Sequence, residues 1–441
     1  MTCPSSTASS LALTLLVCAT SALHAAQPPV FEVSALALPA MDSGAQPDLV
    51  GSANGSLFLS WTEKLDTGHR LRFSRLLEAE EGDTNAEDRW LPAQTIASGD
   101  DWFVNWADTP HLVAFGDGTL WAHWLRKNGT AIYDYGVALV HSGDQGQTWS
   151  APIRLEPEGA RLDYGFVSLW EQHEGVLGIG WLDSRQKQPP HEGHDEHHDH
   201  GGGAMMLRAA TFDAAGVRTG DWALDTATCD CCPTSVAMTS DGAVLAYRGR
   251  TTEEVRDIQL VRLDGRAWSQ PVTVHADNWI FAGCPVNGPA VVASGKQVWV
   301  AWYTEGGGQP AVRIARSRDA GRKFDSPLQV AQGKAQLGRV DMAMDANNVW
   351  LTWLVESSKD NAQQLMLARI DAKSGTLMQR GVVADIAAKG RASGLPQIQV
   401  QEGDAWLVWT DSVDGKLRLR GAKVRSNNKA ATPGPSTKSA P

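Results

Sequence analysis

The sequence is short of positive charge and contains no run of basic residues. Its 39 Lys and Arg side chains are outnumbered by 50 Asp and Glu, which gives a formal net charge of −11. An acidic protein is repelled by phosphate backbones and by anionic lipid headgroups. We therefore expect no nucleic acid among its partners.

Long apolar runs are absent too, apart from one near the N-terminus. No later stretch has the roughly 18 uninterrupted apolar residues of a transmembrane helix, so we expect no membrane span. The early run, Leu11–Val17, is followed by small residues up to Ala25 and Ala26, as in a secretory signal peptide. We expect residues 1–26 to be a signal peptide cleaved near Ala25 or Ala26, and the mature protein to be periplasmic or secreted.

No long helical periodicity is found, and short strand patterns repeat along the mature chain instead. Each repeat has an apolar strand, a Gly/Asp/Asn turn and a second strand that ends in an aromatic residue. Successive aromatic positions lie 51 to 66 residues apart, at Trp61, Trp124, Trp181, Tyr247, Trp302, Trp353 and Trp409. Two further strands follow each aromatic, and four short strands per unit are typical of a propeller blade.

The repeat predicts an all-β fold, a single closed β-propeller over residues 27–424. Seven aromatic positions favour seven blades, with six blades as the alternative. The last unit lacks a fourth strand, which Phe31–Leu36 ahead of the first unit can supply, so that the two chain ends close the ring. The polar, Pro/Ser-rich segment 425–441 is expected to be disordered.

Two segments carry the motif S-x-D-x-G-x-T-W. Ser142–Trp149 matches it at every defined position, and Ser317–Phe324 is a looser copy. Leu263–Trp268 is a candidate for an eroded third. In this motif we expect Asp to accept hydrogen bonds from backbone N–H groups of a tight turn, Gly to supply positive φ and the aromatic to pack between strands.

These motifs are Asp-boxes, and the chain resembles the sialidase-like or BNR-repeat β-propeller superfamily. For an exo-sialidase, the resemblance implies three arginines that hold the substrate carboxylate, a Tyr–Glu nucleophile pair and an Asp acid/base. Arg339 and Arg391 stand where blades six and seven begin, and Tyr303 is the candidate nucleophile. The stretch that matches the first arginine position, Ala45–Leu49, contains none, and the chain has only five tyrosines.

The four cysteines that follow the signal peptide lie just before two innermost strands. They are Cys229, Cys231, Cys232 and Cys284. The loops that enter neighbouring blades converge on the central channel, so we expect these residues to be close in space. Two interpretations stay open at this point: structural disulfides in an exported protein, or a thiolate site for Cu or Zn.

A histidine-rich tract lies in the loop between the second and third strands of blade three, on the same face as the cysteines. It carries His191, His194, His197, His198 and His200 together with four carboxylates. Such a tract is a candidate ligand set for a transition metal, or else a solvated acidic loop.

Three functions follow as hypotheses. The first is an exported propeller that binds a small molecule, a glycan or a metal ion, Cu or Zn, through the cysteines and the histidine tract. The second is a glycoside hydrolase of the sialidase type. The third is a scaffold that engages another envelope protein. The absence of the first arginine favours the first hypothesis over the second.

Overall fold

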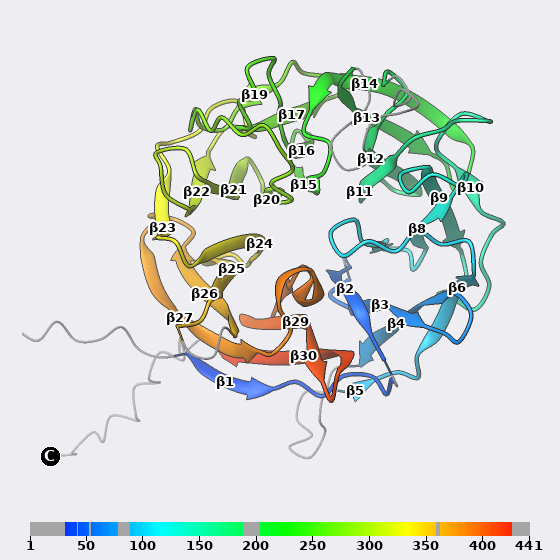
Figure 1. Cartoon of the computed structure of the whole chain (residues 1–441), viewed down its shortest axis with the longest axis horizontal. Helices are drawn as coiled ribbons and strands as arrows, with labels where there is room; N and C mark the ends of the chain where they lie inside the picture. Colours follow the sequence, from blue (N-terminus) through cyan, green and yellow to red (C-terminus); the bar gives the residue numbers. More distant parts are fainter. Residues whose placement is uncertain are drawn as a thin grey trace, which may run out of the picture.

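Seven four-stranded blades surround a central axis (Figure 1). The computed structural model describes residues 31–41, 43–52, 54–77, 89–187, 203–358 and 362–425. In blades 1 to 6 the strand that comes first in the chain is innermost, and the later strands pair outward in antiparallel order. The predicted all-β propeller and its favoured count of seven blades are therefore confirmed for the described part of the chain, which contains no helix long and apolar enough to cross a membrane.

Blades 1 to 3 follow one another along the chain. Blade 1 consists of β2 (Ala45–Gly51), β3 (Leu57–Lys64), β4 (His69–Leu77) and β6 (Gln94–Gly99), with β5 (Arg89–Trp90) paired to the far end of β4. Blade 2 consists of β7 (Leu112–Ala114), β8 (Leu120–Lys127), β9 (Tyr135–Ser142) and β10 (Ile153–Arg154). Blade 3 consists of β11 (Tyr164–His173), β12 (Val176–Asp183), β13 (Met205–Phe212) and β14 (Arg218–Thr228).

Blades 4 to 6 repeat the pattern. Blade 4 consists of β15 (Ser235–Thr239), β16 (Gly242–Arg248), β17 (Ile258–Asp264) and β19 (Val272–Thr273), with β18 (Ala267–Trp268) paired to the end of β17. Blade 5 consists of β20 (Ala290–Ser294), β21 (Gln297–Thr304), β22 (Ala311–Ser317) and β23 (Leu328–Gln332). Blade 6 consists of β24 (Gln336–Met344), β25 (Asn348–Glu356), β26 (Gln363–Asp371) and β27 (Leu377–Ile386).

Blade 7 joins the two ends of the described chain, as expected. Its inner strands are β28 (Gln397–Gln401), β29 (Asp404–Val413) and β30 (Lys416–Arg425), and a short 3-10 helix, η1 (Gly390–Ser393), precedes them. The outer strand is β1 (Glu32–Ala35), which lies beside β30 (Figure 1). In this pairing Glu32 is opposite Arg425. Phe31, just before β1, is buried with its ring centroid 6.1 Å from that of Trp350 in blade 6. This pairing leaves no gap in the ring.

The aromatic residues at the ends of the second strands belong to the core, as the repeat predicts. The second strands are buried on both faces because each blade packs between two neighbours. The exposed fraction of these seven aromatic side chains is at most 6%: they are Trp61, Trp124, Trp181, Tyr247, Trp302, Trp353 and Trp409.

The first Asp-box is a hydrogen-bonded turn between β9 and β10. The carboxylate of Asp144 accepts from the Thr148 N–H at 2.9 Å and from its hydroxyl at 2.6 Å, which lowers the pKa of Asp144 to about 2. Ser142 Oγ accepts from the N–H of Gly146, whose φ is +86°. Trp149 packs edge to face against Phe73 in blade 1, with the two ring centroids 6.1 Å apart. The motif therefore joins two neighbouring blades as well as closing a turn.

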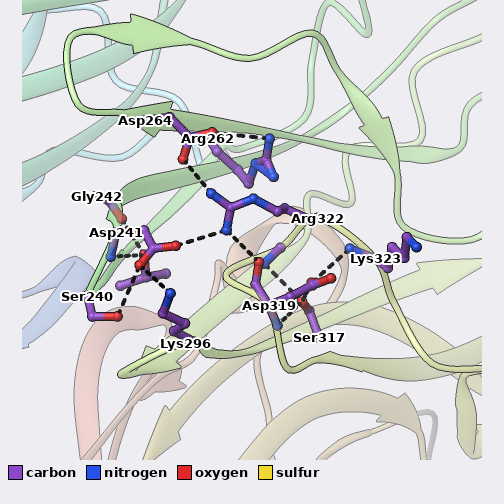
Figure 2. Close-up of polar contacts among 12 residues, drawn as sticks. Ser240, Asp241, Gly242, Arg262, Asp264, Lys296, Ser317, Asp319, Arg322 and Lys323 are labelled. Carbon is purple, nitrogen blue, oxygen red and sulfur yellow. Dashed lines mark hydrogen bonds and ion pairs between the residues drawn. The ribbon is translucent and has the colours of Figure 1, made fainter.

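The second Asp-box joins blade 5 to blade 4 through an ionic network (Figure 2). Asp319 Oδ1 accepts from the Lys323 N–H at 2.9 Å, which is the same turn geometry as in the first box. Arg322 from this turn reaches Asp241 at 2.9 Å and Asp264 at 3.1 Å, both in blade 4. Lys296 also contacts Asp241, at 3.1 Å.

The eroded third copy also contacts the preceding blade. Trp268, at the end of this copy, packs edge to face against Trp170 of blade 3, with the ring centroids 6.2 Å apart.

Carboxylates near the central channel fasten neighbouring inner strands together. Asp48 of blade 1 accepts from the N–H of Leu112 in blade 2 at 2.7 Å. Asp341 of blade 6 accepts from the N–H of Ile398 in blade 7 at 2.9 Å, and Asp108 makes the same kind of bond to blade 3. Burial raises the pKa of Asp108 and of Asp341 to about 7, because a low-dielectric site disfavours the ionised carboxylate.

Candidate thiol and metal site

The first three cysteines lie on the connection from blade 3 to blade 4. The segment leaves the outer strand β14 at Thr228 and runs inward to β15. Its start is fixed to blade 4, because Cys229 N–H donates to the carbonyl oxygen of Arg248 at 2.9 Å. Cys229 and Cys232 are buried and Cys231 is half-buried. A connection that must cross from the rim to the channel thus brings three thiols into the interior.

The three sulfur atoms form a compact group, which we call the thiol cluster (Cys229, Cys231 and Cys232). Cys229 Sγ lies 3.4 Å from Cys232 Sγ and 3.9 Å from Cys231 Sγ, and all three sulfurs lie within 4.8 Å of one another. All three residues are in the reduced thiol form, as is Cys284. Among the described residues, these three cysteines form a group of potential ligands that lie close enough together to share one metal ion.

Hydrogen bonding within the cluster makes its sulfurs unequal. The pKa of Cys229 is lowered well below its usual value because the thiols of Cys231 and Cys232 donate to its sulfur. The pKa of Cys231 is raised because its proton is held by Cys229, and that of Cys232 is raised first by burial. The cluster therefore stabilises one thiolate between two thiol donors, and a thiolate is the form that binds metals.

Two buried arginines stand beside the cluster. Arg248, only 2% exposed, donates to the carbonyl oxygens of Asn287 (2.8 Å), Arg256 (2.5 Å) and Tyr303 (2.7 Å). Its guanidinium also lies 4.9 Å from the ring centroid of Trp279. Arg256 is likewise buried, and the positive charges of Arg256 and Arg248 favour ionised Cys229 and Cys232 respectively.

Cys284 approaches the cluster from the next connection, between blades 4 and 5. It is exposed, and its side chain forms a hydrogen bond with that of Cys231. Both residues line one cavity of about 190 Å³, which we call the mouth cavity. The expectation that the two cysteine-bearing loops meet near the channel is therefore consistent with the structure.

The mouth cavity has aromatic walls and a few charged groups. Trp106, Tyr133 and Tyr135 contribute from blade 2 and its entry loop, and Arg391 of η1 contributes from blade 7. The buried Lys187 is an ion-pair partner of Asp230 at 2.8 Å and of Asp163 at 3.8 Å. Loops from several blades thus build one small chamber over Cys231 and Cys284.

The three residues considered for sialidase chemistry have different surroundings. Arg339 has φ +56°, donates to Ser393 Oγ at 2.6 Å and to the carbonyl oxygen of Gly394 at 3.1 Å, and lies over the ring of Trp106. Burial lowers the pKa of Arg339 to about 10. Arg391 is exposed and lines the mouth cavity.

Tyr303 is buried, and its hydroxyl donates to Glu305 Oε1 at 2.8 Å. Burial and then Glu305 raise the pKa of this phenol. Neither Tyr303 nor Arg339 is among the described residues that line the mouth cavity, so the structure brings only Arg391 of the three to the cysteines.

The histidine tract lies outside the described residues. His191, His194, His197, His198 and His200 fall within the gap 188–202. The flanking strands are β12 and β13 of blade 3, which places the tract in the predicted second-to-third-strand loop.

Sequence reasoning missed the Lys187–Asp230 pair as part of this site. The ion pair joins two loops that no local pattern connects, so the sequence carried no signal for it.

No protein-family model matches the sequence, and no curated protein matches it. Among solved structures, the chain is similar to polysaccharide lyase Uly1 (9% identity, 88% of this chain and 91% of that chain, TM-score 0.49). It is similar to a point mutant of the NanB sialidase from Streptococcus pneumoniae (10% identity, 84% and 83%, TM-score 0.44). It is also similar to the α-L-arabinofuranosidase Arb93A from Fusarium graminearum (11% identity, 88% and 95%, TM-score 0.44). At such low identity the likeness to sialidases and these other proteins concerns the fold alone.

Proposed function

We propose that this chain is an exported propeller that binds a soft transition-metal ion, Cu(I) or Zn(II), through the thiol cluster. The observation that carries the proposal is the convergence of three cysteine sulfurs, all within 4.8 Å of one another, in a largely buried position. Closely spaced thiolates are the preferred ligands of these ions.

The sulfur positions fit one ion. A metal–sulfur bond of about 2.3 Å requires neighbouring sulfurs to be about 3.8 to 4.0 Å apart in tetrahedral or trigonal geometry. The separations of 3.4 and 3.9 Å from Cys229 Sγ are close to that spacing, so small side-chain rotations suffice.

The surroundings favour negative charge on sulfur. Binding requires the loss of thiol protons, and burial alone opposes the ionised form. The positive charges of Arg248 and Arg256 lower the free-energy cost of ionising the buried thiols. Arg248 is suited to this role because its partners are three neutral carbonyl groups and an aromatic ring. None of these partners neutralises its positive charge.

Cys284 sets the coordination number. With Cys284 as a fourth ligand, the site has the four sulfurs of a structural zinc centre, whereas the thiol cluster alone suits three-coordinate Cu(I). Its hydrogen bond to Cys231 places it next to the cluster.

The test is metal content of full-length protein purified from a periplasmic extract without an affinity tag, together with a free-thiol titration. We expect about one Cu or Zn per chain after dialysis, and its loss in Cys229→Ser and in Cys232→Ser. A Ser240→Ala variant, exposed on the Asp-box face, is the matched control. Metal retained in both cysteine variants, or wild-type protein that takes up neither ion when its thiols are reduced, would contradict the proposal.

A further inference from the structure

The mouth cavity brings an exposed thiol and a half-buried thiol to the same small chamber. Cys284 and Cys231 come from different interblade connections and share a hydrogen bond. Behind Cys231 lies the buried remainder of the thiol cluster, with Cys229 Sγ 3.9 Å away. The four thiols thus form a series that leads from solvent to the interior.

We propose that Cys284 and Cys231 are a thiol–disulfide exchange pair, and that the mouth cavity admits small disulfides that carry a carboxylate. This activity goes beyond metal binding: it uses Cys231 and Cys284, whereas Cys229 and Cys232 take no part in it. An exported protein meets such disulfides in its oxidising surroundings.

Accessibility determines the order of events. Cys284 is the exposed member, so its thiolate attacks one sulfur of the small disulfide. The old S–S bond breaks, a mixed disulfide forms on Cys284, and the first small thiol leaves with the proton that Cys284 lost.

Cys231 completes the exchange. Its sulfur attacks Cys284 Sγ and expels the second small thiol, and the Cys231 proton passes to this leaving group. Two protein thiols are oxidised to one Cys231–Cys284 disulfide, and one small disulfide is reduced to two thiols.

The preference for a carboxylate comes from Arg391. The other cation that lines the cavity, Lys187, is already paired with Asp230 at 2.8 Å. The Arg391 guanidinium is exposed at the rim, and the described residues supply no acidic partner for it. A cavity of about 190 Å³ equals about six water molecules at roughly 30 Å³ each, which is enough for an amino-acid-sized half of a disulfide.

The experiment compares two probes, cystine and cystamine, which share a disulfide but differ in their carboxylates. Reduced, metal-free full-length protein is mixed with each probe, and thiol loss is followed over time. Mass spectrometry of peptides then locates the new bond. We expect a Cys231–Cys284 disulfide, formed faster with cystine than with cystamine once both rates are divided by those for free cysteine.

Arg391→Ala should lower the cystine-over-cystamine ratio about fivefold, the size of one exposed charge contact. Arg266→Ala, an exposed arginine on the Asp-box face, should leave the ratio unchanged. Cys284→Ser should leave the remaining thiols slow to react. A first disulfide between Cys229 and Cys232, or a ratio that Arg391→Ala does not change, would overturn the proposal.

The outcome is separable from that for the metal site. Disulfide exchange is measured without metal, while metal content is measured on Cys229→Ser and Cys232→Ser, which retain the exchange pair. If the thiol cluster does bind metal, oxidation of Cys231 removes one of its ligands, and cystine should release the ion.

Discussion

Gly146 of the first Asp-box lies directly against the ring of Phe73 in the neighbouring blade. A Cβ atom at Gly146 would come within 2.3 Å of Phe73 Cζ, and the residue has φ +86°. The shape of the turn and the packing between blades therefore both depend on the absence of a side chain at Gly146.

We expect Gly146→Ala to lower the free energy of unfolding by about 2 to 4 kcal/mol, since it adds both a steric clash and an unfavourable positive φ. Gly143→Ala, three residues earlier in the same turn, is the matched control because a Cβ there meets nothing within 4 Å. Urea denaturation of both variants measures the difference. Equal midpoints for the two variants would show that the box does not support blade packing.

The N-terminal strand should contribute strongly to stability. Phe31 is buried against Trp350, whereas Val33 in the same segment is 38% exposed. Phe31→Ala is expected to cost about 3 kcal/mol and Val33→Ala less than about 1 kcal/mol. Thermal unfolding followed by tryptophan fluorescence compares them, and a similar loss for both would argue against closure through this strand.

The buried carboxyls near the channel predict a fall in stability as pH rises. The pKa of Asp341 is about 7 in the folded chain, against about 3.9 in unfolded peptides. Between these pH values the folded state keeps a proton that the unfolded state has released, so the contribution of this carboxyl is greatest below pH 4 and is lost by pH 7.

Between pH 5 and pH 8, the wild-type protein should lose more free energy of unfolding than Asp341→Asn does. The expected difference between the two losses is about 2 to 3 kcal/mol. Asp66→Asn, on an exposed turn, should show the wild-type pH dependence. Urea midpoints at the two pH values provide the measurement. An unchanged pH dependence in Asp341→Asn would mean that this carboxyl is ionised in the folded protein.

Bound metal should raise the stability of the proposed holoprotein. A ligand at one hundred times its dissociation constant adds about 2.7 kcal/mol to the free energy of unfolding. We expect a higher unfolding midpoint with Zn(II) or Cu(I) than with chelator present, and no such difference in Cys232→Ser. A metal-induced shift of equal size in that variant would place the stabilising ion elsewhere.

The sequence was enough to predict the propeller because its signals recur. The spacing from Trp61 to Trp409 repeats a complete blade, and Asp144 stands in a motif whose hydrogen bonds are local. The closing strand was predictable because the last unit lacked a partner strand. The meeting of Cys231 with Cys284 followed from the position of each before an inner strand.

Features that depend on several blades were not visible in the sequence. Three inner strands shift register against the second strand of their blade, and a residue with positive φ lies at each shift. These residues are Gln46, Phe166 and Arg339, and none is a glycine. Tertiary contacts between inner strands impose this conformation, and no local propensity reveals it. The mouth cavity is similarly hidden because loops of separate blades contribute its walls.

The pairing of β1 with β30 has a consequence for how the chain folds during its synthesis. β1 is the first of the described strands to leave the ribosome and β30 is the last, so β1 has no partner strand until β30 has been made. A chain that stops early keeps an open sheet edge, which invites aggregation and proteolysis. Only a chain that contains both β1 and β30 can therefore close the ring and protect this sheet edge.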